Sequence, residues 1–334
     1  MKNILLNIFG GYIFFIFSNG KMKWESLGLI FNPKKYLKWV KSHAWVPTPI
    51  VIKKDKVRVF FAGRDKENHS NIGFFDVSLK NPKKIIKVSN QPILKKGRLG
   101  CFDDSAAIPS YITKINKKYF LYYVGWTRGI TVPYISSIGL AVSNNLNGKF
   151  KRISESPIIG KSKFDPIFTA SCFVEKKDKK FKMIYTSNRS WKNDKFFIPN
   201  YNIKYAYSKN GIDWKVTNKF LLKKNTEKEI AITRPWLLNE KNKKLLFYSY
   251  KNYKNKGRNY KIGFASREQN LWKRKDSNLQ IENKKDTFDK SMQEYASIIK
   301  YKDFYYMFYN GNNYGENRIG LAKINKTEIM KYMY

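Results

Sequence analysis

Ile-Pro-Ser-Tyr at residues 108–111 begins a stretch of four short apolar runs, which continues with 119–123 (Tyr-Phe-Leu-Tyr-Tyr), 138–141 (Ile-Gly-Leu-Ala) and 150–152 (Phe-Lys-Arg). Runs of this length that are rich in aromatic and β-branched residues, with polar turns between them, are typical of β-strands. The stretch therefore predicts four consecutive strands.

The four runs recur along the chain with a step of roughly 60 residues. The first runs lie at 46–49, 108–111, 170–173, 233–236 and 294–297. Four strands in each of five repeats predict an all-β fold, a five-bladed β-propeller of four-stranded antiparallel blades. The fifth repeat lacks a fourth run, and we expect residues 23–27 to supply it and to close the ring. A β-sandwich with accidental repeats is the alternative.

Composition narrows the classes of function. The formal charge is +41, from 66 Lys and Arg against 25 Asp and Glu. Few of the cations are arginine, the residue best suited to phosphate and base recognition, and the lysines are scattered, so no specific nucleic-acid partner is expected. Lysine-rich turns between the first and second strands leave weak association with an anionic membrane as an alternative. Two cysteines and two histidines argue against a disulfide scaffold or a zinc site, and neither a metal nor a cofactor is expected.

The N-terminal residues 1–21 form an apolar leader, and residues 22–334 are expected to be a single propeller domain. The leader allows three interpretations: a cleaved signal, an anchor, or an upstream start codon wrongly included. The third is preferred, with Met22 as the start and a cytoplasmic protein, and export or membrane anchoring as the alternative.

Antiparallel pairing predicts which residues share the mouth of the central channel. The start of each first strand and the end of each second strand lie on the same face. Polar and aromatic residues at these places suit sugars, whose hydroxyls need charged and amide partners and whose rings stack on aromatic side chains. The candidate binding residues are His43, Trp45, Arg64, Asp103, Trp126, Asp165, Arg189, Arg234, Asn310 and Asn312.

Three carboxylates are candidate catalytic residues: Glu294, Asp104 and Asp65. Glycoside hydrolysis needs a proton donor and a second carboxylate, and Glu294 with Asp104 or Asp65 is the expected pair. Asp104 and Asp165 lie six positions before aligned strand residues, and a carboxylate repeated in this way is more often a turn cap than a catalyst. Phosphorolysis is the alternative chemistry, with inorganic phosphate bound by Arg234, Arg64 and Arg189.

Several motifs resemble one known superfamily. They are 43–49 (His-Ala-Trp-Val-Pro-Thr-Pro), 102–105 (Phe-Asp-Asp-Ser), 168–171 (Phe-Thr-Ala-Ser), 233–235 (Thr-Arg-Pro) and 306–312 (Tyr-Met-Phe-Tyr-Asn-Gly-Asn). From about Met22 to Ala322 the chain is similar to a poorly characterised bacterial group among the arabinanase/levansucrase/invertase-like five-bladed propellers. That superfamily includes glycoside hydrolase families 32, 43, 68 and 130, the last of them phosphorolytic.

The resemblance implies a glycan-processing enzyme, either a glycosidase or a phosphorylase. Members of the bacterial group accompany surface-polysaccharide genes, which implies a surface or cell-envelope carbohydrate as the substrate. The hydrolytic families carry an essential Asp in the first strand of the first blade, whereas residues 44–48 (Ala-Trp-Val-Pro-Thr) contain no carboxylate. A non-catalytic carbohydrate-binding propeller therefore stays open, and so does a charge-driven binder of an anionic surface or of nucleic acid.

Overall fold

The computed structural model describes residues 8–9, 12–13, 20–177, 180–194, 196–224, 229–252, 259–282, 288–316 and 318–333. The regular secondary structure of these residues is almost all β-strand, and the α-helices among them, α1 (Asn312–Gly315) and α2 (Lys326–Met330), are short. Most of the leader lies outside the described residues, apart from the small hairpin of β1 (Ile8–Phe9) and β2 (Tyr12–Ile13). Within the described ranges, no helix has the length and apolar character needed to cross a membrane.

Strands form where the apolar runs predicted them. The first two repeats comprise β4 (Ser42–Lys53), β5 (Lys56–Arg64), β6 (Ser70–Ser78), β7 (Asn81–Val88), β8 (Ala106–Ile115), β9 (Lys118–Arg128), β10 (Tyr134–Ser143) and β11 (Lys151–Arg152). The third and fourth comprise β12 (Phe168–Lys177), β13 (Lys180–Asp194), β14 (Phe196–Ser208), β15 (Lys215–Leu222), β16 (Glu229–Glu240), β17 (Lys243–Asn252), β18 (Lys261–Glu268) and β19 (Leu271–Arg274). The last repeat contains β21 (Glu294–Tyr301), β22 (Phe304–Asn310) and β23 (Ile319–Asn325).

The N-terminal strand β3 (Met22–Phe31) joins the C-terminal sheet. It pairs antiparallel with β23, with Ser26 opposite Ala322, which agrees with the pairing expected for residues 23–27. The structure differs in two features from the separate four-stranded sheets that the sequence predicts. The short strand β20 (Leu279–Glu282) adds to β3 in parallel, so this sheet has five strands. A single parallel pair, Ser70 with Ala106, links β6 to β8 and merges the first two repeats into one sheet.

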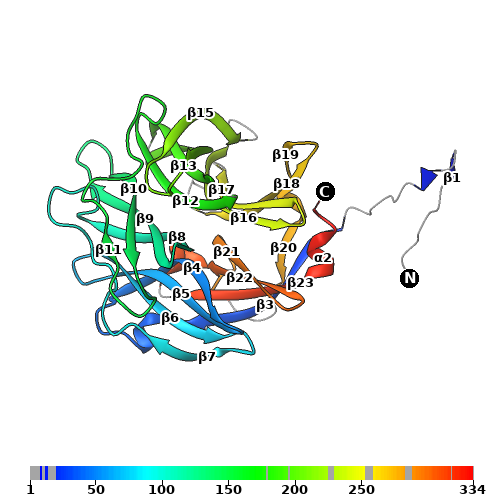
Figure 1. The fold of residues 1–334 in the computed structure, drawn as a ribbon, viewed down its shortest axis with the longest axis horizontal. Helices are drawn as coiled ribbons and strands as arrows, with labels where there is room; N and C mark the ends of the chain where they lie inside the picture. Colours follow the sequence, from blue (N-terminus) through cyan, green and yellow to red (C-terminus); the bar gives the residue numbers. More distant parts are fainter. Residues whose placement is uncertain are drawn as a thin grey trace.

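The first strands of the repeats converge on a common centre (Figure 1), while β7, β11, β15 and β19 lie toward the outside. Contacts between first strands run in closed order: β4 contacts β8, β8 contacts β12, β12 contacts β16, β16 contacts β21, and β21 contacts β4. Because β4 and β21 belong to the first and last repeats, these contacts bring the two ends of the repeat array together.

Arg234, on β16, connects the converging strands. Its side chain is 1% exposed. The guanidinium donates from Nη1 to the carbonyl and hydroxyl oxygens of Ser110 on β8. From Nη2 it donates to Pro47 O and Thr48 Oγ1 on β4, both at 3.0 Å, and to Ser297 Oγ on β21 at 2.9 Å. One side chain thus satisfies polar groups on three other first strands.

A tyrosine–carboxylate hydrogen bond recurs inside the repeats. Tyr123 donates to Asp103, Tyr185 to Asp165, and Tyr309 to Asp289, always across 20 positions of sequence. The carboxylate equivalent to Asp165 is therefore Asp103, whereas the sequence spacing assigns that place to Asp104. A nearby cation completes two of these groups: Arg152 lies 2.6 Å from Asp103, and Lys204 lies 2.7 Å from Asp165.

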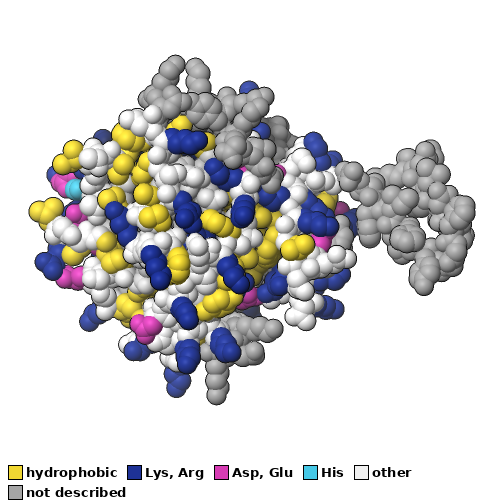
Figure 2. All heavy atoms as spheres, turned by 90° about the horizontal axis from the view of Figure 1, so that it is seen from above, with side chains coloured by type: hydrophobic (Ala, Val, Ile, Leu, Met, Phe, Trp, Pro, Cys, Tyr) yellow, Lys and Arg dark blue, Asp and Glu magenta, His cyan; other side chains and the backbone are white. Residues whose placement is uncertain are grey.

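Positive charge is not gathered in one place on the face that Figure 2 shows. Lys and Arg side chains are spread over that surface, with few Asp or Glu between them. A nucleic-acid surface usually concentrates its cations on one face or along one groove. The even spread on the visible face favours a compositional origin for the charge.

Arg234 generates a stability prediction. Arg234→Met removes five buried hydrogen bonds that join β16 to three other first strands, and a buried hydrogen bond contributes about 0.5–1.5 kcal/mol, or more when the donor is charged. We expect the free energy of unfolding, measured by urea denaturation, to fall by about 3 kcal/mol or more. The matched control, Arg189→Met, removes a half-buried arginine that donates one hydrogen bond, to Asn218, within the described ranges and packs near the Phe220 ring, and it should change stability by about 0.5 kcal/mol or less. Equal stability losses in the two variants would contradict the central role of Arg234.

Candidate functional site

A cavity of about 300 Å³ opens at the centre, lined by residues from every repeat. Its walls are strongly aromatic. The aromatic lining residues are Trp45, Trp126, Tyr134, Trp191, Phe197, Tyr201, Tyr260, Tyr295 and Tyr314. A concave site with this lining suits a sugar ring, whose C–H face stacks on aromatic side chains.

The aromatic rings form two walls. On one wall Trp126 stacks on Tyr134 with ring centroids 4.5 Å apart and an interplanar angle of 7°. Trp45 and Trp191 extend this wall at either end, with centroids 5.4 Å from Trp126 and from Tyr134 respectively. The other wall centres on Tyr260, whose ring lies 5.9 Å from Tyr295 and 6.3 Å from Tyr314.

Two cations line the cavity, one near each wall. The guanidinium of Arg64 lies 5.1 Å from the centroid of the Trp45 ring, and the ammonium of Lys251 lies 4.8 Å from that of Tyr260. Burial lowers the pKa of Lys251 to about 8, against a smaller opposing effect of Glu294. Neither cation forms a salt bridge with an acid among the described residues.

Glu294 lies next to this cavity, one residue before Tyr295. It begins β21 and is completely buried, and neither carboxyl oxygen has a hydrogen-bond partner among the described residues. Burial raises the pKa of Glu294 well above its usual value, and the neighbouring Tyr295 and Lys251 offset this only in part. The carboxyl therefore keeps its proton to a higher pH than an exposed glutamic acid does, which favours the role of a proton donor, as a general acid must be.

Within the part of the chain that the structure describes, the lining contains no carboxylate, and Glu294 itself lies behind it. Hydrolysis by the two-carboxylate route needs a general base or a nucleophile opposite the acid. The expected pairs of Glu294 with Asp104 or Asp65 are therefore not brought together at the cavity wall.

Asp65 and Asp104 are bonded within their own loops. One Asp65 oxygen accepts the backbone N–H groups of Glu67 and His69 at 3.1 and 2.9 Å, and the other accepts Asn71 Nδ2 at 3.1 Å. Asp104 accepts the N–H of Gly100 at 3.1 Å and the hydroxyl of Ser105 at 2.9 Å. Both carboxylates act as turn caps, which is the structural alternative that sequence spacing favours for Asp104.

The predicted binding residues divide into two groups. Trp45, Arg64 and Trp126 line the cavity. The others do not: His43, Asp103, Asp165, Arg189, Arg234, Asn310 and Asn312. Asp103 and Asp165 hold tyrosines inside the repeats, and Arg234 is enclosed among the first strands. Arg189 instead donates to Asn218 of β15, an outer strand.

The remaining predicted residues shape the rim. Asn310 is buried and bridges the last repeat to the first, because its side chain accepts from Val46 N and donates to Ala44 O, both at 2.8 Å. Asn312 accepts from Ser291 and Met292 in a neighbouring loop. His43 has a positive φ of 64°, and burial together with the nearby Arg64 lowers its pKa to about 4, so its ring is neutral near pH 7.

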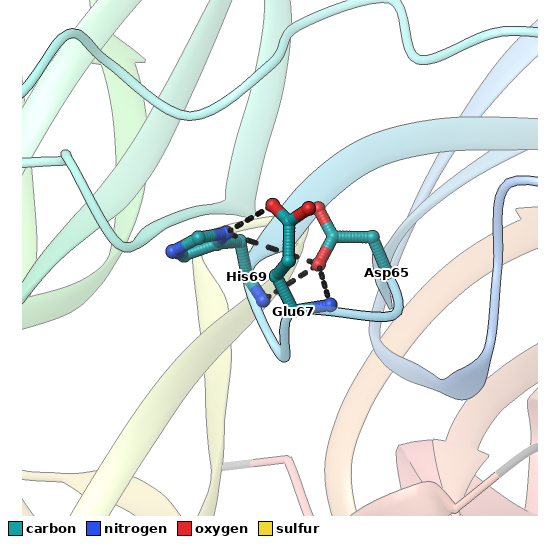
Figure 3. Close-up of side chains that lie close together, drawn as sticks. All are labelled: Asp65, Glu67 and His69. Atoms are coloured by element: carbon teal, nitrogen blue, oxygen red, sulfur yellow. Dashed lines mark hydrogen bonds and ion pairs between the residues drawn. The ribbon is translucent and has the colours of Figure 1, made fainter.

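The structure also brings together three side chains of types that can bind a metal ion. Ligand atoms of Asp65, Glu67 and His69 lie within 4.8 Å of one another in the turn between β5 and β6 (Figure 3). His69 Nδ1 lies 3.5 Å from Glu67 and 3.9 Å from Asp65. Because Asp65 already accepts two backbone N–H groups, this arrangement is accounted for by capping of the turn.

Sequence reasoning missed Lys251 and several tyrosines. Tyr134 begins β10, Tyr260 directly precedes β18, Tyr201 lies early in β14, and Lys251 lies at the end of β17. An antiparallel third strand begins where the second ends. Applying the same antiparallel-pairing argument to the starts of third strands would have predicted the tyrosines. Lys251 could not be singled out in this way because lysine is abundant throughout the sequence.

Comparisons with known proteins fit this geometry. No family model matches the chain. The uncharacterized protein Rv1502 of Mycobacterium tuberculosis (strain ATCC 25618 / H37Rv) is 31% identical over 302 residues, which cover 90% of this chain and 99% of that protein. The uncharacterized protein MT1551 of strain CDC 1551 / Oshkosh matches to the same extent.

Solved structures of glycoside hydrolase propellers share the fold. A structure described as a glycoside hydrolase superposes with a TM-score of 0.69 at 14% identity, over 89% of this chain and 90% of that protein. A structure from the GH130 family of mannoside phosphorylases, which "contains glycoside hydrolases that target beta-1,2 mannosidic linkages in Candida mannan", gives 0.66 at 18% identity over 86% of each protein. A thermostable family-43 glycoside hydrolase gives 0.61 at 13% identity, over 85% of this chain and 89% of that protein. The expected resemblance to propeller glycoside hydrolases is confirmed at the level of the fold.

The buried carboxyl predicts a pH-dependent stability. The pKa of Glu294 in the folded state lies above the usual value near 4.5, so the folded state binds more protons than the unfolded state between the two values. The free energy of unfolding of the wild type should therefore fall as pH rises through this window. Glu294→Gln cannot titrate, so in urea denaturation its stability relative to the wild type should increase as pH rises above the usual value near 4.5.

Glu240→Gln is the control of opposite sign. Hydrogen bonds from Lys300 and Tyr305 lower the pKa of Glu240, so its stabilisation is present above the usual pKa and lost as pH falls through the folded value. This variant should lose stability relative to the wild type at neutral pH and recover in acid. Parallel pH profiles for the wild type and Glu294→Gln would show that Glu294 is ionised in the folded protein.

Proposed function

This chain belongs to the same protein family as the mycobacterial protein Rv1502, and we propose that it is a glycan-processing enzyme that cleaves a glycosidic bond in the aromatic cavity. One observation carries the proposal. A completely buried carboxyl with a raised pKa, that of Glu294, adjoins a central cavity lined with aromatic rings on a glycoside hydrolase fold. The substrate that we propose is a bacterial surface or cell-envelope carbohydrate, as the sequence resemblance implies.

The proposed scaffold is a five-bladed propeller in which each repeat forms one blade. Strand β3 supplies the outer strand of the last blade and thereby joins the ends of the ring. The closed order of contacts between first strands supports this arrangement, and so does the antiparallel pairing of β3 with β23. Such a ring directs side chains from all blades into one cavity.

In the proposed reaction, a sugar ring stacks on the wall formed by Trp126 and Tyr134. Glu294 gives its proton to the leaving glycosidic oxygen as the bond to the anomeric carbon breaks, while the oxygen of a water molecule forms the new bond to that carbon and releases a proton to the solvent. Glu294 is screened from the cavity by its own burial, so the side chain must turn toward the substrate past Tyr295 when the complex forms. Catalytic contacts of this kind often tighten only in the bound state.

Phosphorolysis is the second candidate. It is favoured because the described part of the cavity lining contains two cations, Arg64 and Lys251, and no carboxylate. Here an oxygen of inorganic phosphate forms the new bond to the anomeric carbon, and the leaving oxygen takes the proton of Glu294. Phosphate is already anionic and needs no general base. Of the arginines proposed for phosphate from the sequence, only Arg64 lines the cavity, and Lys251 takes the place of the other two.

The role of Glu294 is tested with glycosides of different leaving groups. Protonation matters most when the leaving alcohol is poor, so Glu294→Gln should lower kcat on unactivated oligosaccharides by about 10²–10⁴-fold, and far less on nitrophenyl glycosides. Asp104→Asn, which alters a carboxylate bonded within its own loop, is the control and should retain turnover. A uniform loss on every leaving group, or no loss on any, would overturn the assignment of Glu294 as the proton donor.

The two reactions differ in their dependence on phosphate. A phosphorylase should release a sugar 1-phosphate and stop turning over when phosphate is removed, and Arg64→Gln should raise the KM for phosphate. A hydrolase should release the free sugar at a rate that phosphate does not change. Binding of oligosaccharide without either product would identify a carbohydrate-binding propeller.

A further inference from the structure

A second cavity opens beside the aromatic one. It has a volume of about 230 Å³ and shares Arg64, Trp126 and Tyr134 with the aromatic cavity. Its own lining includes Arg128, from the end of β9, and we call it the Arg64–Arg128 groove. A ligand seated against Trp126 and Tyr134 can therefore extend a substituent into the groove.

The groove brings two guanidinium groups together without an acidic partner. The positive charge of Arg128 lowers the pKa of Arg64, in addition to the larger effect of burial. Among the described residues neither arginine forms a salt bridge. The Arg64 side chain packs over the Trp45 ring and donates a hydrogen bond from Nη1 to the neutral amide of Asn68 at 3.2 Å. The acid that faces Arg64 is Glu316, which is exposed and acts on it from beyond ion-pair distance.

The protein holds Arg128 in place through backbone atoms. Its Nη2 donates to the carbonyl oxygens of Glu67 and Asn68, both at 3.1 Å. Those carbonyls belong to the turn that Asp65 caps (Figure 3), so the carboxylate of Asp65 stabilises the turn and is not directed at the arginine. Arg128 Nη1 and Nε donate no hydrogen bond to the described residues, which leaves them available to a ligand.

We propose that the Arg64–Arg128 groove binds an anionic substituent, a carboxylate or a phosphate ester, of a saccharide whose ring lies in the aromatic cavity. The inference rests on the proposed function and deepens it by naming the substrate class, an acidic glycan. Guanidinium groups suit both anions because their donors match the spacing of two oxygens. Held at fixed positions, they also lose little freedom on binding.

The experiment uses the whole chain and a glycan array built in matched pairs. Each bacterial oligosaccharide is present with its free carboxylate or phosphate ester and again as its methyl ester or dephosphorylated form. We expect the wild type to bind the charged member of its preferred pair at least about 10-fold more tightly, since hydrogen bonds to charged groups are the strong ones. Arg128→Gln should bring this ratio close to one, and Arg128→Lys should retain part of it.

Arg98→Gln is the matched control, because it removes one positive charge from an exposed arginine that pairs with Glu155, outside both cavities. It should leave the ratio unchanged. Equal binding of charged and neutral members would overturn the inference while leaving the proposed function intact. So would a ratio that persists in both Arg64→Gln and Arg128→Gln.

Two more results would each overturn the inference for a different physical reason. Inorganic phosphate that binds as tightly as a phosphorylated saccharide, and competes with it, would identify a free-anion site. A folded wild type that binds no member of the array, charged or neutral, would contradict the proposed function itself, and the inference with it. Circular dichroism confirms in each case that the variants are folded.

Discussion

The arrangement of the whole molecule depends on how the backbone carbonyls of the converging first strands find hydrogen-bond donors. Neighbouring first strands form no ladders with one another among the described residues, and Pro47 and Ser110 each fall at a register shift in the ladder to the second strand. Their carbonyls accept from Arg234 instead, and that of Pro47 also accepts from Ser297 Oγ. A buried acceptor without a donor costs free energy comparable to a lost hydrogen bond. The guanidinium of Arg234 satisfies several such groups at once, with a fork of donors that no other side chain offers. Its burial without an acidic partner lowers its pKa to about 9, which leaves it charged near neutral pH.

Hydrogen bonds and ion pairs inside the repeats determine which charged side chains reach the cavity. The chain has 25 acidic residues, and several of them are held inside repeats or loops by tyrosines, cations and backbone N–H groups. Arg274 similarly binds both Glu229 and Asp276. These contacts keep the ionised carboxylates away from the central lining. The carboxyl of Glu294 is buried outside the lining and burial raises its pKa, so Arg64 and Lys251 are the charged residues among the described lining residues.

The sequence predicted the strands well because each apolar run has the length and composition of a strand, and the repeat confirms it several times. Antiparallel pairing of first and second strands also predicted that Trp45, Arg64 and Trp126 share the central cavity, and the three residues do line it. It failed for acids such as Asp103 and Asp165, since a carboxylate that bonds a tyrosine inside a blade looks, in sequence, the same as one that faces the channel. Arg234 was placed on the correct strand, but its depth along the axis depends on packing between strands, which the sequence pattern does not encode. Asp104 differs from Asp103 by one position, and only the partner tyrosine distinguishes them.

The charge of the cavity links the proposed reaction to the proposed substrate. Cleavage of a glycosidic bond passes through an oxocarbenium-like transition state, which carries positive charge on the sugar ring. Arg64 and Lys251 oppose that charge, and no ionised carboxylate among the described lining residues offsets them. An anion that arrives with the reactants removes this penalty, whether it is phosphate acting as the nucleophile or an acidic group on the glycan. The groove beside the aromatic cavity provides a place for the acidic group where it neutralises Arg64 without occupying the position of the nucleophile. In the proposed reaction a neutral glycan brings no such anion, so its transition state would meet the uncompensated charges of Arg64 and Lys251.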